Sequence, residues 1–335
     1  MEAVSLKDNW QIIKVLDLKR IWNIIKLYTS HLLSSITGKA VHWGVPFSLD
    51  FEPTTSCNLG CPECPSGLKK FSRPKGMLDP IFFNQIISQV KGEVFYLMFY
   101  FQGEPYLNKN FLEMVNLAKK FKMYVATSTN AHFITEDIAN RTVLSGLDRM
   151  IISIDGIGQA SYEKYRVFGD YSKVISGTKK MVEAKRKLGK GPHLIWQFIV
   201  FKHNEHQIED VKKLGKELGV NEVRIKSAQI YNPEDKKDWI PENLNYSRYP
   251  IKEDQIRNSC WRVWHTSVIT WDGRVLPCCY DKDAQNQYGK ISSSSSWLDI
   301  IKSSKAVHFR SELKKNRKSK EICRNCGEGL KVWRK

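Results

Sequence analysis

The stretch Cys57-Asn58-Leu59-Gly60-Cys61-Pro62-Glu63-Cys64 places three cysteines on one short loop, directly after the strand-like run Pro46-Phe47-Ser48-Leu49-Asp50-Phe51. Three thiolates can hold a four-iron cluster by three corners and leave the fourth iron free to bind another molecule, whereas an electron carrier usually supplies four thiolates. The spacing therefore predicts a redox catalyst rather than an electron carrier. A zinc loop or a disulfide pair is the alternative, although zinc sites favour Cys-x2-Cys pairs closed by a second pair elsewhere.

Length and composition are those of an ordinary globular protein. The chain has 335 residues, 41% of them hydrophobic, so it can bury a large core in one main domain and a smaller one. Its first residues lack the basic-then-apolar order of a secretory signal, and no uncharged apolar stretch approaches the length that spans a bilayer. We therefore expect the protein in the cytoplasm. Thiols stay reduced there, so the eight cysteines are better explained as metal ligands than as disulfides.

The formal net charge of +18 is concentrated at the C-terminal end. Residues 302–335 hold twelve Lys or Arg against three Glu, so a tenth of the chain carries half of the charge. A basic surface attracts acidic partners such as nucleic acid, anionic lipid, or an acidic flavodoxin or ferredoxin that delivers electrons. A solvated basic tail that only aids solubility is the alternative.

The pattern of residues 9–35 predicts a helix, with Ile21, Ile25, Tyr28 and Leu32 at helical spacing. Basic and aromatic residues accompany this stripe: Trp10, Lys19, Arg20, Trp22 and Lys26. Such a helix can make a peripheral contact with a membrane surface or bind a partner, or it can pack across one end of the core domain.

Between residues 46 and 227, strand-like and helix-like segments alternate. The strands predicted after the first are 94–101, 123–128, 149–154, 193–201 and 222–226. A helix with core-facing spacing begins at Phe111, and Thr135 followed by Glu136 and Asp137 marks the start of the next. Near-continuous apolar strands joined by helices predict a parallel sheet covered on both faces, and the pattern alone leaves a doubly wound sheet and a barrel open.

The cysteine spacing, its place after the first strand and the strand–helix repeats resemble the radical S-adenosylmethionine (radical SAM) enzymes. The resemblance implies an α/β fold, a partial (β/α)6 TIM-like barrel with its chemistry at the carboxyl ends of the strands. It also implies that Cys57, Cys61 and Cys64 bind a [4Fe-4S] cluster whose open iron holds SAM. An electron from that cluster cleaves SAM to a 5′-deoxyadenosyl radical, which abstracts a substrate hydrogen. Glu63 departs from the family, where an aromatic residue usually precedes the last cysteine.

Polar residues follow the predicted strands in the order of the SAM contacts in this family. Gln102-Gly103-Glu104-Pro105 resembles the Gly-Gly-Glu-Pro motif, in which a glycine backbone and the acidic residue receive the SAM amino group. Ser128-Thr129-Asn130 resembles the ribose-binding turn, and Arg166 could pair with the SAM carboxylate. The resemblance thus implies a SAM site made of Gln102, Gly103, Glu104, Ser128, Thr129, Asn130, Ser153, Asp155 and Arg166. Each motif taken alone is also a common loop sequence.

Five further cysteines lie beyond the barrel pattern. Cys260-x12-Gly273-x4-Cys278, followed by Cys323-Arg324-Asn325-Cys326, resembles the twitch form of the SPASM/twitch extension, whose first pair flanks a β-hairpin. Residues 270–275 contain the Asp-Gly turn that a hairpin needs. The resemblance implies an auxiliary [4Fe-4S] cluster held by Cys260, Cys278, Cys323 and Cys326, with Cys279 as a spare. A zinc ribbon on the same four cysteines is the alternative.

The expected organisation is an N-terminal helical segment (1–45), a radical SAM partial barrel (46–227), a connecting loop (228–259) and a twitch domain with a basic tail (260–335). An auxiliary cluster with every iron capped favours electron transfer over substrate binding. We therefore expect an oxidoreductase that abstracts hydrogen from a small or medium-sized substrate and passes an electron to that cluster, with no residue singled out as catalytic acid or base. Peptide modification, RNA modification and a zinc-stabilised binding protein are the alternatives.

Overall fold

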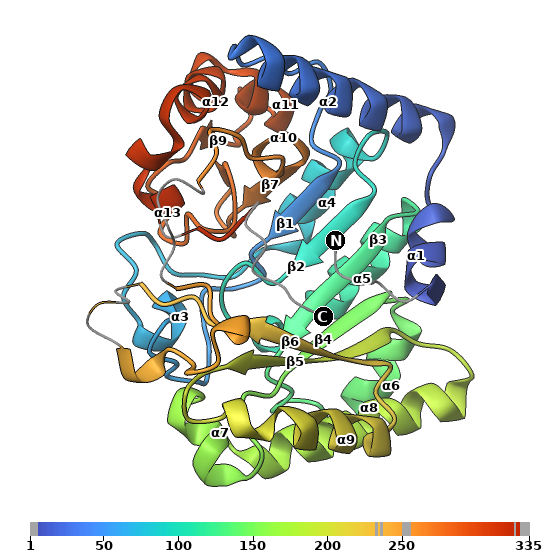
Figure 1. Cartoon of the computed structure of the whole chain (residues 1–335). Helices are drawn as coiled ribbons and strands as arrows, with labels where there is room; N and C mark the ends of the chain where they lie inside the picture. Colours follow the sequence, from blue (N-terminus) through green and yellow to red (C-terminus); the bar gives the residue numbers. More distant parts are fainter. Residues whose placement is uncertain (1–5, 232–233, 235–236, 250–255, 325, 329–335) are drawn as a thin grey trace.

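The computed structural model describes residues 6–231, 234, 237–249, 256–324 and 326–328. Its centre is a nine-stranded sheet with the order β6-β5-β4-β3-β2-β1-β7-β8-β9. The first six strands are parallel neighbours: β1 (Ser48–Phe51), β2 (Tyr96–Phe99), β3 (Tyr124–Thr129), β4 (Arg149–Ser153), β5 (His193–Val200) and β6 (Glu222–Ser227). Because β6 and β9 end the order on opposite sides, the sheet stays open, and the predicted partial barrel is confirmed (Figure 1).

Helices follow the strands, and all of them except the short α3 pack on the sheet through apolar side chains. They are α3 (Pro65–Leu68), α4 (Pro80–Val90), α5 (Phe111–Lys120), α6 (Glu136–Leu144), α7 (Gln159–Tyr165), α8 (Tyr171–Leu188) and α9 (Ile208–Leu218). Asp79, Thr135 and Asp170 accept hydrogen bonds from free amides in the first turns of α4, α6 and α8, which fixes where these helices begin. The helix start predicted at Thr135 is therefore confirmed.

The N-terminal segment forms two helices where the sequence predicted one. α1 (Leu6–Ile13) and α2 (Leu18–Thr37) are separated at Asp17, whose backbone is extended and whose side chain accepts from the amide of Arg20. An Asp in this conformation caps a new helix rather than continuing the previous one. Both helices lie at the amino ends of the strands: Asp8 accepts from Arg149, the first residue of β4, and Arg20 donates to the carbonyls of Phe121 and Lys122, just before β3.

The C-terminal region continues the barrel sheet. β7 (Thr266–Ile269) pairs in parallel with β1 and is followed by the antiparallel β8 (Arg274–Leu276) and β9 (Gly289–Lys290). Gly273 has a φ of +88° in the turn between β7 and β8, so the predicted hairpin is confirmed. The helices of this region are α10 (Arg262–His265), α11 (Trp297–Lys302), α12 (Ser304–Asn316) and α13 (Glu321–Arg324).

The remaining parts of the described chain are the connecting residues and the basic C-terminal segment. The connecting residues 228–259 contain only short 3-10 turns where the structure describes them, η3 (Lys237–Trp239) and η4 (Leu244–Tyr246). The basic C-terminal segment is helical as far as Arg324, and three of its cations are buried, Arg310, Lys314 and Arg317. Among the described helices, none is both long enough and apolar enough to cross a bilayer.

Candidate active site

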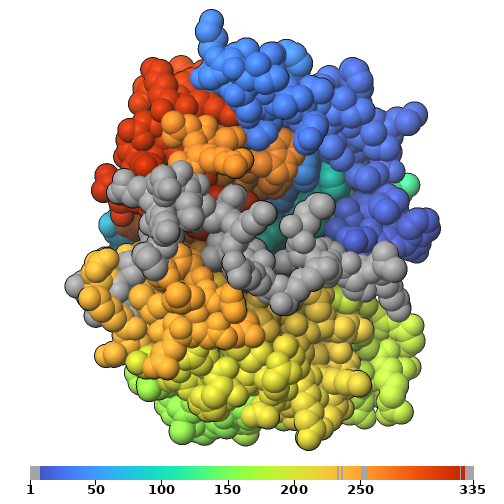
Figure 2. Space-filling view, in the orientation of Figure 1, coloured from blue at the N-terminus to red at the C-terminus, as the bar shows by residue number. Residues whose placement is uncertain are grey.

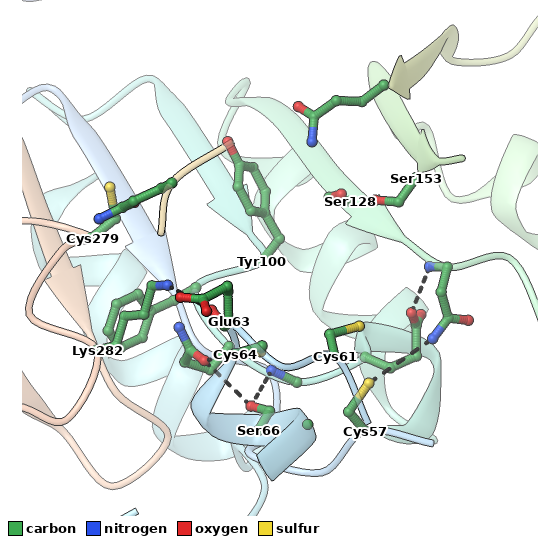
Figure 3. Close-up of a pocket in the computed structure, with 18 of the residues that line it drawn as sticks. Cys57, Cys61, Glu63, Cys64, Ser66, Tyr100, Ser128, Ser153, Cys279 and Lys282 are labelled. Atoms are coloured by element: carbon green, nitrogen blue, oxygen red, sulfur yellow. Dashed lines mark hydrogen bonds between the residues drawn. The ribbon is translucent and has the colours of Figure 1, made fainter. Parts of the chain in front are cut away.

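A cavity of about 900 Å³ lies at the carboxyl ends of the barrel strands. Its walls come from the cysteine loop, from the ends of the parallel strands, and from the C-terminal region through Cys279, Gly327 and Glu328. Figure 3 shows Cys57, Cys61 and Cys64 on one loop, with Cys279 on a separate wall. Pockets of this size hold cofactor-sized or drug-sized ligands. Because the carboxyl ends of parallel strands meet at one edge of the sheet, residues far apart in the sequence converge here.

The three cysteines of the loop line this cavity; Cys57 and Cys61 accept N–H donors on sulfur, whereas the Cys64 thiol donates to Gln102 Oε1 at 3.8 Å. Cys57 Sγ accepts from the amide of Leu59 at 3.5 Å and from Asn130 Nδ2 at 4.0 Å, and Cys61 Sγ accepts from Arg166 Nη1 at 3.8 Å. Burial raises the pKa of the Cys57 thiol to about 12, so a thiolate there requires a compensating positive charge. A bound iron supplies such a charge, and N–H donors to sulfur are the usual surroundings of cluster thiolates.

Gly103 and Glu104 form a turn that packs against the chain just before the cysteine loop. Gly103 has a φ of +73°, and a Cβ at this position would lie 2.1 Å from the carbonyl oxygen of Thr54, so only glycine fits. The buried Glu104 carboxylate accepts from Thr129 Oγ1 at 2.6 Å and from the Asn130 amide at 2.8 Å. Burial raises the pKa of Glu104 to about 7 despite these hydrogen bonds, so a cation placed beside it would stabilise its charged form.

Eight of the nine residues predicted to contact SAM line the cavity: Gln102, Gly103, Glu104, Ser128, Thr129, Asn130, Ser153 and Arg166. Asp155 is the exception, because it is fully buried behind Arg166. Arg166 Nε donates to Asp155 Oδ2 at 2.6 Å, and Asp155 Oδ1 accepts from the amide of Ile199 at 2.7 Å. Asp155 therefore holds the guanidinium of Arg166 at the cavity wall and does not reach the cavity itself.

Several cavity residues were not predicted from the sequence: Asp50, Met98, Tyr100, Gln197, Lys226, Arg248, Arg262 and Lys282. Asp50 is the most informative of them, since Oδ1 is buried with no hydrogen-bond partner in the described structure. Burial raises the pKa of Asp50 to about 7, while the nearby charge of Arg262 lowers it. The sequence feature that could have indicated this site residue is a single carboxylate inside the apolar strand Leu49-Asp50-Phe51.

Glu63, the departure from the family pattern, ties the cysteine loop to later parts of the chain. Its buried carboxylate accepts from the amide of Tyr231 at 2.8 Å, and its carbonyl oxygen accepts from Lys282 Nζ at 3.4 Å. Lys282 also lies over the ring of Tyr231, 4.7 Å from the centroid. Glu63 thus helps to fix the wall of the cavity opposite the strands.

The C-terminal cysteines form a second group beside the cavity. Cys278, Cys323 and Cys326 are buried and Cys260 is half-buried, and none of the four lines the cavity. Cys279 does line it, and its Sγ accepts from Arg262 Nη1 at 3.9 Å. The two adjacent cysteines therefore lie in different surroundings.

Arg317 provides a test of whether the second group suits an anionic cluster. Burial opposes its charge, yet the negative charge of the ionised sulfurs of Cys260, Cys326 and Cys323 raises the pKa of Arg317. Its Nε is buried without a hydrogen-bond partner in the described chain, so it is free to donate to a cluster sulfur. In the described part of the chain, no three Cys, His, Asp or Glu side chains approach closely enough to share one metal ion. A four-iron cubane does not require such close approach, because each of its ligands would bind a different iron.

Comparison with known proteins agrees with this geometry. A model of the radical SAM superfamily matches residues 51–223, and a model of the SPASM iron–sulfur cluster-binding domain matches residues 260–327. The tungsten-containing aldehyde ferredoxin oxidoreductase cofactor-modifying protein of Pyrococcus furiosus is 24% identical over 253 residues, which cover 69% of this chain and 70% of that protein. The PqqA peptide cyclase of Gluconobacter oxydans is 27% identical over 262 residues, with 70% of each protein covered.

Solved structures share the fold at low sequence identity. SuiB of Streptococcus suis bound to S-adenosylmethionine has a TM-score of 0.61 and 16% identity, over 86% of this chain and 73% of that one. BtrN in complex with AdoMet and 2-DOIA has a TM-score of 0.52 and 18% identity, over 85% and 94% of the two chains.

The chain belongs to the radical SAM superfamily, since the family model covers more than half of it. Its SPASM domain assigns it to the SPASM branch of that superfamily. It is an enzyme, and its cofactors are [4Fe-4S] clusters and S-adenosylmethionine.

Proposed function

We propose that this enzyme is an oxidoreductase that removes hydrogen from a small polar substrate in the cavity. The observation that carries the proposal is that one cavity is bounded both by the cysteine loop and by Cys279, Gly327 and Glu328, the neighbours of the second cysteine group. A substrate held there lies between the two groups. When bound, the cofactors supply a radical that takes one hydrogen atom and a second cluster that accepts one electron.

The ligand sets follow from the surroundings of the thiols. Cys57, Cys61 and Cys64 hold the SAM-cleaving cluster, because all three line the cavity from one short loop, and Cys57 and Cys61 accept from Asn130 and Arg166. Cys260, Cys278, Cys323 and Cys326 hold the auxiliary cluster beside the unpartnered Arg317 Nε. Cys279 remains a cavity residue.

The predicted SAM contacts divide into three functions. Glu104 accepts the SAM ammonium, and Ser128, Thr129, Asn130 and Ser153 are near the ribose. Arg166 pairs with the SAM carboxylate, and Asp155 keeps the guanidinium in position. Gln102 and Gly103 complete the turn, in which Gln102 Oε1 accepts from Ser66 Oγ at 3.4 Å and the Gly103 amide donates to the same hydroxyl at 3.0 Å.

Asp50 is our candidate for the proton acceptor. Oxidation of an alcohol carbon to a carbonyl removes one hydrogen atom, one electron and one proton, and the proton must go to a base at the cavity. The unpartnered carboxylate of Asp50 lines that cavity, and its pKa of about 7 is poised for proton transfer at neutral pH.

The polar walls favour a small hydroxylated substrate. Carboxylates, amides and cations of the described chain surround the cavity away from the cysteine loop, including Asp50, Gln197, Lys226, Gln229, Arg248 and Arg262. These groups can hydrogen-bond hydroxyls or an anionic substituent. Peptide modification is the second candidate, since the relatives include a PqqA peptide cyclase and SuiB was solved bound to the precursor peptide SuiA.

An acidic flavodoxin or ferredoxin is the electron donor that the charge favours. The net charge of +18 attracts an acidic partner, and exposed cations of the C-terminal helices include Lys302, Lys305, Lys315 and Arg324. The cytoplasm remains the compartment that we propose, because reduced thiols and low-potential donors occur there.

The experiment begins with anaerobic reconstitution, followed by counting of iron and acid-labile sulfide. We expect about eight iron atoms per chain and formation of 5′-deoxyadenosine from SAM when a strong reductant is added. Candidate polyols and candidate peptides are then compared for their ability to stimulate this reaction and to yield an oxidised or crosslinked product. Zinc in place of iron at the second group, or stimulation by peptides alone, would overturn the proposal.

Asp50→Asn tests the environment of the proposed base. The folded-state pKa of Asp50 is raised, so the folded state holds the proton that the unfolded state has released, and the wild type loses stability as pH rises from about 4 to about 7. Because the variant lacks this titration, its stability relative to wild type should rise over that interval by up to about 4 kcal/mol. Thermal unfolding between pH 4 and pH 8 measures the difference.

The control for this prediction is Asp170→Asn. The hydroxyl of Ser172 lowers the pKa of Asp170, so its contribution to stability changes only below about pH 4, and the difference in stability between this variant and the wild type should stay constant from pH 5 to pH 8. Uncoupled SAM cleavage should be unchanged in Asp50→Asn. With substrate present, product formation should fall by about 10²–10⁴-fold. A pH-independent difference in stability would show that Asp50 is not held in the environment described.

A further inference from the structure

Helix α2 buries a polar face. Its buried residues are Arg20, Asn23, Leu27, Ser30 and Ser34, of which only Leu27 is apolar. The guanidinium of Arg20 donates to main-chain carbonyls, including those of Lys91 at 2.9 Å and Phe121 at 3.0 Å. Asn23 exchanges two hydrogen bonds with the backbone of Val45, at 2.8 and 2.9 Å. The helix is therefore attached to the barrel by polar contacts, the reverse of the usual arrangement of a surface helix.

The opposite side of α1 and α2 is apolar and exposed. Ten of the eighteen exposed large hydrophobic residues in the described chain lie within its first 43 residues. They are Trp10, Ile13, Leu18, Ile21, Trp22, Ile25, Tyr28, Leu32 and Ile36, together with Trp43 in the segment that follows α2, and we call this set the α1–α2 face. Along α2 they recur every three or four residues, and Leu18 and Ile36 near its ends are 86% and 75% exposed. Figure 2 shows α2 at the outer surface of the molecule.

Cations surround this face. Lys14 and Lys39 are exposed and Lys26 is half-buried, while the exposed Lys19 pairs with Glu93 at 2.9 Å. The one exposed acidic residue between residues 9 and 43 is Asp17, which caps α2. Trp10, Trp22, Tyr28 and Trp43 are the residue types that favour the boundary between lipid headgroups and acyl chains. A second copy of the chain would bring the same lysines against each other. The combination of apolar stripe, interfacial aromatics and lysines complements an anionic lipid surface.

We propose that the α1–α2 face docks the enzyme on an anionic membrane, with α2 lying in the plane of the headgroups. A helix of twenty residues is about 30 Å long, so the face offers an extended contact. The contact lies at the amino ends of the strands, whereas the active-site cavity lies at their carboxyl ends. Docking therefore leaves the cavity accessible from the aqueous side.

Vesicle sedimentation with the reconstituted enzyme tests the proposal. One set of vesicles contains equal parts of phosphatidylcholine and phosphatidylglycerol, and a second contains phosphatidylcholine alone. We expect binding to the anionic vesicles that weakens as salt is added, and weaker binding to the neutral ones. The variant Trp22→Ser, Ile25→Ser and Leu32→Ser removes the centre of the face, and its affinity should fall by about tenfold or more.

The matched control replaces three exposed apolar residues elsewhere, Ile81→Ser, Leu144→Ser and Val307→Ser. This control should bind vesicles as the wild type does, and both variants should keep the iron content and SAM cleavage of the wild type. No binding of the wild type to either vesicle overturns the proposal, as does an equal loss of binding in the two variants. A wild-type dimer that the first variant converts to a monomer would assign the face to a second copy of the chain instead.

Discussion

Cys61→Ala is expected to abolish reductive SAM cleavage and to remove about half of the iron, because a cluster held by three thiolates has no ligand to spare. The same result is expected for Cys57→Ala and Cys64→Ala. Cys323→Ala should also remove about half of the iron, yet it should leave uncoupled SAM cleavage in place, since in the proposed function the auxiliary cluster accepts an electron only after the radical has formed. Iron and sulfide counts together with 5′-deoxyadenosine assays measure both effects.

Cys279→Ala is the matched control for the second group. Cys278 and Cys279 are neighbours in the sequence, but only Cys279 lines the cavity and accepts from Arg262. The variant should retain about eight iron atoms, whereas Cys278→Ala should retain about four. The reverse outcome would assign the fourth ligand to Cys279 and place the auxiliary cluster in the cavity wall.

The elements of the barrel were predictable because each depends on residues close together in the sequence. The strands and the start of α6 at Thr135 follow from apolar runs and a capping side chain. The turn Gln102-Gly103-Glu104 reaches the cavity because it follows a parallel strand, whose carboxyl end lies at the site in every unit of this fold.

The remaining features depend on contacts between distant parts of the chain. Helical spacing indicated that Ile21, Ile25, Tyr28 and Leu32 share one face of a helix, but periodicity does not show whether that face meets the protein or the solvent. The alternation of residues along a strand likewise could not indicate that Asp50 would share a cavity with Arg262 and Lys282. Asp155 was predicted as a SAM contact from its place after β4, and only the three-dimensional structure shows that Arg166 stands between it and the cavity.

Arg166→Ala is expected to destabilise the protein by about 3–5 kcal/mol, because it leaves the fully buried carboxylate of Asp155 without its ionic partner. It should also weaken SAM binding by roughly tenfold to a hundredfold, the cost of one charge-assisted hydrogen-bonded contact. Arg166→Lys should recover part of the stability but not the two-point contact, since an ammonium cannot replace the planar fork of the guanidinium. Thermal unfolding and equilibrium SAM binding, both without oxygen, measure the two effects.

The double variant Arg166→Ala with Asp155→Asn separates the two roles of the pair. Removing the stranded charge should restore most of the lost stability, while SAM binding should stay weak because the guanidinium is absent. Arg141→Ala is the matched control: its ion pair with Asp137 is exposed, so the free energy of unfolding should change by less than about 0.5 kcal/mol. Recovery of SAM binding together with stability in the double variant would contradict a direct contact between Arg166 and SAM, and would reduce the role of Arg166 to supporting the fold around Asp155.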